Sequence, residues 1–114
     1  MKFYKDKELK DEISDNEAYD LGIVDIGTTK EYNIYAHNNS GGLSRNISFS
    51  LEPDKEKYSN EEKEIVKDEC EIISYLDSMK INEVGILKIS YSPLGELRKG
   101  LKIKISSKEQ IIYT

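Results

Sequence analysis

The chain has 114 residues, of which 34% are charged and 37% belong to the apolar set, and its formal net charge is −5. This length is typical of one domain with one hydrophobic core. No block of Lys or Arg forms a basic face, so the composition argues against a nucleic-acid binder. The single cysteine, Cys70, cannot form an internal disulfide, which favours a reducing compartment or an assembly.

The first twenty residues are charged throughout and contain no apolar h-region, so we expect no signal peptide. No apolar run in the chain approaches the roughly eighteen residues that a membrane helix requires. Residues 1–20 are compatible with a short helix, an edge strand, or an arm that becomes ordered against a partner, and a solvated terminus is common for such a composition. We therefore expect a charged extension or arm over residues 1–20 and a folded domain over residues 21–114.

From Leu21 onward the hydrophobic pattern has a period of two, which is typical of half-buried antiparallel strands. Residues 38–42 form an Asn- and Gly-rich cluster that predicts a turn. Residues 52–64 are almost all charged or turn-forming, and we expect a long solvated loop there with a short edge strand. The side chains expected to point inward are Tyr32, Ile34, Ala36, Ile47, Phe49, Leu51, Leu87, Ile89, Tyr91, Leu101, Ile103 and Ile105.

Towards the C-terminus, residues 101–106 show a clear alternation and residues 110–113 predict a separate final strand. The whole chain then has seven or eight strands at spacings near ten residues. This pattern predicts an all-β fold, a sandwich or a small barrel. On the outward faces, Lys88, Lys102 and Lys104 are expected either to form a basic stripe or simply to protect strand edges.

No motif in the chain specifies a reaction. His37 is the only histidine and is expected on an outward strand face, and nothing in the sequence brings it to Cys70. One histidine and one cysteine cannot supply a zinc site, and the acidic segments do not match a calcium-binding loop. No glycine pair precedes a helix, as a phosphate loop would require. We therefore predict no catalytic residue, no cofactor and no metal.

Three segments together resemble a known group of domains. Leu21–Thr29 (LGIVDIGTT), Tyr35–Ser40 (YAHNNS) and Gly85–Pro93 (GILKISYSP) are similar to the strand motifs of immunoglobulin-like domains of the ASPM–SPD-2–Hydin and major-sperm-protein type. The similarity spans roughly residues 20–106. It implies an immunoglobulin-like antiparallel β-sandwich.

A short, stand-alone domain of this kind is similar to small virion structural proteins of tailed bacteriophages. The resemblance implies a non-enzymatic protein of the virion, made in the host cytoplasm, that decorates the capsid or lies at the head or neck. Its partners would be the major capsid protein or head–tail junction proteins, with self-association possible and no nucleic acid or membrane involved. A cellular adaptor that recognises a peptide by strand addition is the alternative. The interface candidates are Phe3, Tyr4, Leu9, Tyr35, His37, Asn38 and Asn39.

Overall fold

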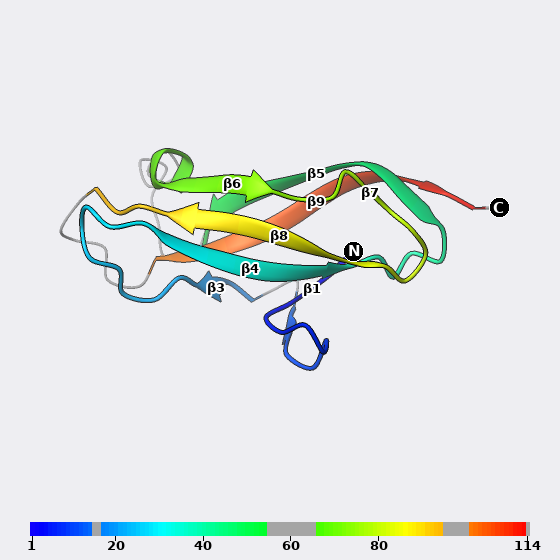
Figure 1. The fold of residues 1–114 in the computed structure, drawn as a ribbon, viewed down its shortest axis with the longest axis horizontal. Coiled ribbons are helices and arrows are strands. Elements are labelled where there is room, and N and C mark those ends of the chain that lie inside the picture. The colour runs from blue at the N-terminus through cyan, green and yellow to red at the C-terminus, as the bar shows by residue number, and fades with distance from the viewer. Residues whose placement is uncertain (15–16, 55–65, 95–100, 114) are drawn as a thin grey trace.

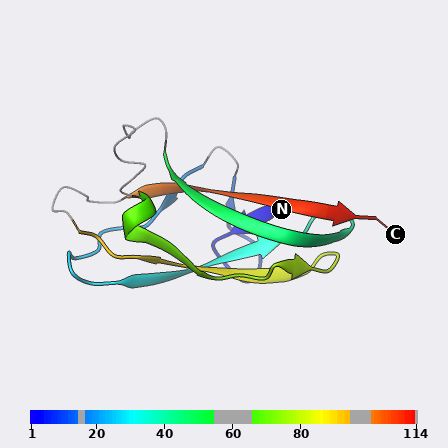
Figure 2. The same ribbon diagram turned by 90° about the horizontal axis from the view of Figure 1, so that it is seen from above.

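The computed structural model describes residues 1–14, 17–54, 66–94 and 101–113. These residues form two antiparallel sheets that pack face to face, which confirms the predicted all-β sandwich (Figures 1 and 2). The five-stranded sheet has the order β2-β1-β4-β8-β6, and the four-stranded sheet has the order β3-β9-β5-β7. The strands are β1 (Lys2–Tyr4), β2 (Glu12–Ile13), β3 (Tyr19–Asp20), β4 (Lys30–His37), β5 (Leu43–Pro53), β6 (Cys70–Ser74), β7 (Ser78–Met79), β8 (Val84–Tyr91) and β9 (Lys102–Ile112).

The core lies between the two sheets and is built from the alternating residues of the long strands. Ile34 on β4, Ile89 on β8 and Ile103 on β9 have no exposed surface. Every second side chain of a strand points to the same face, so the period of two in the sequence becomes one buried face on each sheet. The predicted inward set is accordingly buried or partly buried throughout.

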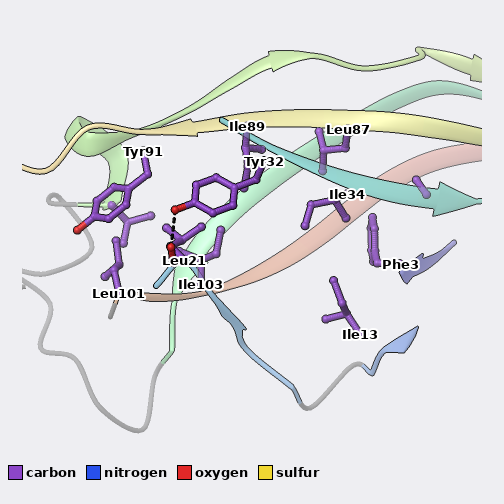
Figure 3. Packing of buried hydrophobic residues seen from close by; sticks show 12 residues of the cluster. Phe3, Ile13, Leu21, Tyr32, Ile34, Leu87, Ile89, Tyr91, Leu101 and Ile103 are labelled. Carbon is purple, nitrogen blue, oxygen red and sulfur yellow. Dashed lines mark hydrogen bonds between the residues drawn. The ribbon is translucent and has the colours of Figure 1, made fainter. Parts of the chain in front are cut away.

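Tyrosine supplies much of the core at the end where β3 meets β9. The Tyr32 hydroxyl donates a hydrogen bond to the backbone carbonyl of Leu21, which Figure 3 shows among the packed side chains. The ring of Tyr19 meets that of Tyr32 edge to face, with the centroids 6.0 Å apart. Burial raises the pKa of Tyr32 to about 12. A phenol can therefore fill the core here because its one polar atom has a partner.

The sequence allowed a helix, an edge strand or an arm for the N-terminal segment, and the structure shows strands at the edge of the five-stranded sheet. Strand β1 pairs antiparallel with β4, and β2 pairs with β1 (dark blue in Figure 1). Phe3 and Ile13 are buried and belong to the hydrophobic core. Residues 2–13 are therefore part of the sandwich, because the side chains of Phe3 and Ile13 pack into its interior.

The turn between β1 and β2 is held by one carboxylate. Asp6 accepts hydrogen bonds from the backbone N–H groups of Lys10 at 3.0 Å and Asp11 at 2.8 Å. The Asp11 bond is the largest of the causes that lower the pKa of Asp6. A side chain that bonds backbone N–H groups ahead of it is a common way of closing a tight turn. The charge-rich composition of this segment thus serves its local structure.

The C-terminal segment corrects the prediction of two separate strands. Strand β9 runs without interruption over 11 residues, and Phe49 and Ser48 on β5 pair with Ser107 and Lys108 in its middle. The polar stretch SSKEQ suggests a break in the sequence, but β5 pairs with β9 on both sides of it, with one shift of register between Arg45 and Ser48. Pairing between strands depends on backbone groups, so polar side chains do not end it.

Two predicted loops lie largely outside the described residues. Of the expected loop over 52–64, the structure describes residues 52–54, and Glu52 and Pro53 extend β5. The sequence of residues 93–96, Pro-Leu-Gly-Glu, also predicts a break in the strand pairing, because proline lacks a backbone donor, and residues 95–100 are not described.

Gly42, which directly precedes β5, lies very close to the backbone at the end of β9, and a substitution tests this close approach. A Cβ atom at Gly42 would lie 2.6 Å from the backbone oxygen of Ile112. We expect Gly42→Ala to lower the free energy of unfolding by about 1–3 kcal/mol, the range for overpacking, in urea denaturation. Gly85→Ala is the matched control, because its Cβ would meet the exposed side chain of Leu76 instead of backbone. Equal losses for the two variants would contradict this account.

Candidate protein-binding surface

Three of the predicted interface residues come together on the outer face of the five-stranded sheet. Tyr4 on β1 lies opposite Tyr35 on β4, and Tyr35 lies opposite Ile86 on β8. One step along the strands, His37 lies opposite Val84. We call this set, Tyr4, Tyr35, His37, Val84 and Ile86, the aromatic face. It spans three neighbouring strands of one sheet.

The outward position of the aromatic face follows from the alternation of side chains on strands whose other face is buried in the core. Because Phe3, Ile34, Ala36 and Leu87 point into the core, the residues between them on the same strands point outward. The Tyr4 and His37 rings lie 6.4 Å apart between centroids, in a tilted arrangement. Val84 keeps 37% and Ile86 47% of its surface exposed. Both lie on β8, opposite the partly exposed His37 and Tyr35 of β4, so aromatic and apolar side chains adjoin on this face.

Ion pairs flank the aromatic face on two sides. Lys2 lies 3.7 Å from Glu12, and Lys88 lies 4.0 Å from Glu31. These side chains are substantially exposed, so each pair contributes little to stability. The charges around the face are nevertheless balanced locally, in a chain whose net charge is −5. The arrangement is an apolar centre with a mixed-charge rim, which suits binding to another surface.

Val84 and Ile86 were not predicted as site residues. The only signal in the sequence is that Ile86 and Val84 are apolar at positions where the alternation of β8 expects polar side chains. Their meeting with Tyr35 and His37 depends on the β4–β8 register, which is not encoded by either strand alone.

The other predicted interface residues lie elsewhere. Phe3 is buried and packs edge to face on Phe49, with the centroids 6.0 Å apart. Leu9 adopts a φ of 59° in the turn between β1 and β2 and is partly buried. Asn38 has no exposed surface, whereas its neighbour Asn39 is exposed. The structure thus brings Tyr4, Tyr35 and His37 together and leaves these four apart.

Asn38 has a structural position at the corner that joins the two sheets. Its amide nitrogen donates to the backbone carbonyls of Gly42 at 2.9 Å, Lys80 at 2.9 Å and Met79 at 3.2 Å. Its amide oxygen accepts from the hydroxyl of Ser40 at 2.6 Å. One buried side chain therefore connects the β4–β5 turn with the segment after β7.

The three lysines of the possible basic stripe do not form one surface. Lys88 lies on β8 in the five-stranded sheet, whereas Lys102 and Lys104 lie on β9 in the four-stranded sheet. The outer faces of the two sheets point in opposite directions. The alternation of each strand was predicted correctly, but the sheet to which each strand belongs was not available from it.

His37 and Cys70 are far apart. His37 pairs with Val84 at one end of β8, and Cys70 pairs with Tyr91 at the other end. Seven residues of extended strand correspond to about 23 Å. Within the described ranges, no three side chains of the His, Cys, Asp and Glu types gather closely enough to hold a metal ion. In the same part of the chain, no helix is both long and apolar enough to cross a membrane.

Comparisons with known proteins do not assign the chain to a family. No family model matches it, and searches of curated proteins and of solved structures found no match.

Substitution of Asn38 by aspartate tests its structural role. The carboxylate cannot donate to three buried carbonyl groups, so we expect Asn38→Asp to lower the free energy of unfolding at pH 7 by about 1–3 kcal/mol. Protonation of the new carboxyl at low pH should recover part of this loss. The exposed neighbour provides the control, and Asn39→Asp should change stability by less than about 0.5 kcal/mol. An unchanged urea midpoint for Asn38→Asp would show that the amide is dispensable.

The thiol of Cys70 offers a further test of the packing. Burial, with a smaller contribution from Glu69, raises its pKa to about 12. The reactive thiolate is therefore scarce in the folded protein at pH 8, and we expect iodoacetamide to modify Cys70 at least about tenfold more slowly than in urea-unfolded protein. Equal rates in the two states, followed by mass spectrometry, would show that the thiol is exposed.

Proposed function

We propose that this chain is a non-enzymatic structural protein that binds another protein through the aromatic face. The single observation that carries the proposal is the outward-facing cluster on three paired strands, in which Val84 and Ile86 are exposed and Tyr4, Tyr35 and His37 are partly exposed. Tyrosine combines a large apolar ring with a hydroxyl, and such residues carry much of the energy of protein interfaces. The occupant that fits is a protein surface with an apolar centre and polar groups that meet the ion pairs at the rim.

The position of the cluster on a sheet supports binding without rearrangement. The central strand β4 is paired on both sides, with β1 and with β8. Side chains on such a paired strand keep their positions when a partner arrives, so little conformational entropy is lost in complex formation.

The kind of partner is proposed from the sequence resemblance. We place the chain among immunoglobulin-like proteins of tailed-bacteriophage virions, with the major capsid protein or a head–tail junction protein as its partner. The two-sheet architecture is compatible with this class, but folds of this architecture serve many functions. The aromatic face would lie against the virion shell.

Copy number in purified particles tests the virion assignment. Quantitative mass spectrometry should find the chain in particles, at a ratio near unity to the major capsid protein for a decoration protein or at a few copies per particle for a neck protein. Complete absence from the particles would overturn the assignment. A cellular adaptor would then be the working hypothesis.

A charge placed in the centre of the aromatic face tests the docking surface. We expect Ile86→Asp to reduce incorporation into particles about tenfold or more, because it places a charge in an apolar interface centre. Ile23→Asp is the matched control, since Ile23 is 77% exposed and lies outside the face. Both variants should keep the thermal unfolding midpoint of the natural sequence.

Point variants are the better probe here than deletion of residues 1–20. That deletion would remove Phe3 and Ile13 from the core, so a loss of docking would not separate binding from folding. Normal incorporation of Ile86→Asp, or an equal loss in both variants, would contradict the proposed surface.

A further inference from the structure

A groove runs along one edge of the sandwich, between β5 of one sheet and β6 of the other. Its volume is about 490 Å³. The residues that line it are Leu51, Glu52, Pro53, Lys67, Cys70, Glu71 and Ile72. The groove lies on a different part of the molecule from the aromatic face, which is formed by β1, β4 and β8.

The groove is the part of this edge that the described residues leave open. Further along, the connection from β6 to β7 crosses from one sheet to the other. The ring of Tyr75 packs edge to face on Phe49, with the centroids 5.3 Å apart, and the N–H of Ile47 donates to the carbonyl of Asp77 at 3.0 Å. Towards Pro53 and Cys70, no strand among the described residues makes such a crossing.

Both walls of the groove are strand edges. In the described part of the chain, β6 pairs with β8 alone. The half of β5 from Ser48 to Pro53 pairs with β9, while β7 pairs with β5 only at Ser44 and Arg45. A strand that is paired on one side presents backbone N–H and C=O groups on the other, and an added extended segment can bond to them.

The side chains of the groove define which segment fits. Leu51, Cys70 and Ile72 pack against the hydrophobic core and form an apolar floor. Glu52, Glu71 and one lysine, Lys67, are exposed at the rim, so the rim carries a net negative charge. An extended segment places alternate side chains on one face. The floor therefore fits apolar residues at every second position, and the rim carboxylates fit Lys or Arg at the flanks.

We propose that this edge is a second binding site, which accepts an extended, cationic segment of a partner protein as an added strand. The net charge of −5 disfavours a second copy of the chain as the occupant, because two acidic rims would meet. The site is independent of docking through the aromatic face, and either can fail without the other.

An NMR titration of the full, isotope-labelled chain tests the site directly. The probe is the blocked peptide Lys-Ile-Thr-Val-Thr-Ile-Lys, and the control is the same peptide with proline in place of both threonines, which removes two backbone donors. We expect the first peptide to shift the amide resonances of residues 48–53 and 70–74 and the second to leave them unchanged. No shift at millimolar peptide, equal shifts with the proline peptide, or shifts confined to the aromatic face would overturn the proposal.

Charge reversal at the rim gives the matched variants. Glu71→Lys should weaken binding of the peptide about two- to fivefold, the effect of an exposed charge pair. Glu8→Lys makes the same change of charge at an exposed position in the β1–β2 turn and should leave the affinity unchanged. Equal effects of the two would show that only net charge matters, which would also overturn the site. Normal binding by Ile86→Asp would separate this result from the outcome for the aromatic face.

Discussion

The pairing of β4 with β8 is the constraint on which the rest of the structure depends. The two strands pair along their whole length, from Lys30 opposite Tyr91 to His37 opposite Val84. One face of this ladder supplies the centre of the hydrophobic core, and the other supplies most of the aromatic face. A shift of one residue in the register would exchange the two faces, so core packing holds the outer surface in place. The proposed binding surface is thus stabilised by residues that never touch a partner.

The two ends of this ladder are completed in different ways. At the His37 end, the buried amide of Asn38 ties the β4–β5 turn to the segment after β7, and Gly42 allows the backbone to approach β9 closely. At the other end, Tyr32 bonds to the carbonyl of Leu21 and brings the segment before β4 onto the core. Both devices satisfy buried polar groups within the chain, as a small core requires.

The two proposed binding surfaces use different properties of the sandwich. The aromatic face relies on side chains that the sheet holds rigidly, whereas the groove between β5 and β6 relies on backbone groups at strand edges. A partner surface and a partner strand are distinct kinds of ligand, so the two proposals together describe a chain that joins two other proteins. A sandwich whose edges are only partly closed offers both on a small scaffold.

Much of the fold followed from local patterns. The alternation in residues 32–36, 87–91 and 101–105 correctly predicted which side chains are buried, because the period of a strand is a property of the strand itself. Tyr4, Tyr35 and His37 were recognised as candidate interface residues from their types and expected exposure. Their meeting on one face, and the addition of Ile86, could not be predicted, because no single strand contains the information about its neighbour.

The sequence by itself therefore determined the class of fold, the buried faces and the absence of any recognisable catalytic motif. The tertiary structure alone decided that the N-terminal segment pairs with β4, that Lys88 and Lys104 lie on opposite sheets, and that β9 is one continuous strand. The physical reason is that strand order and register arise from contacts between residues far apart in the chain, where many pairings have similar local preferences. Only the packing of the complete core selects one of them.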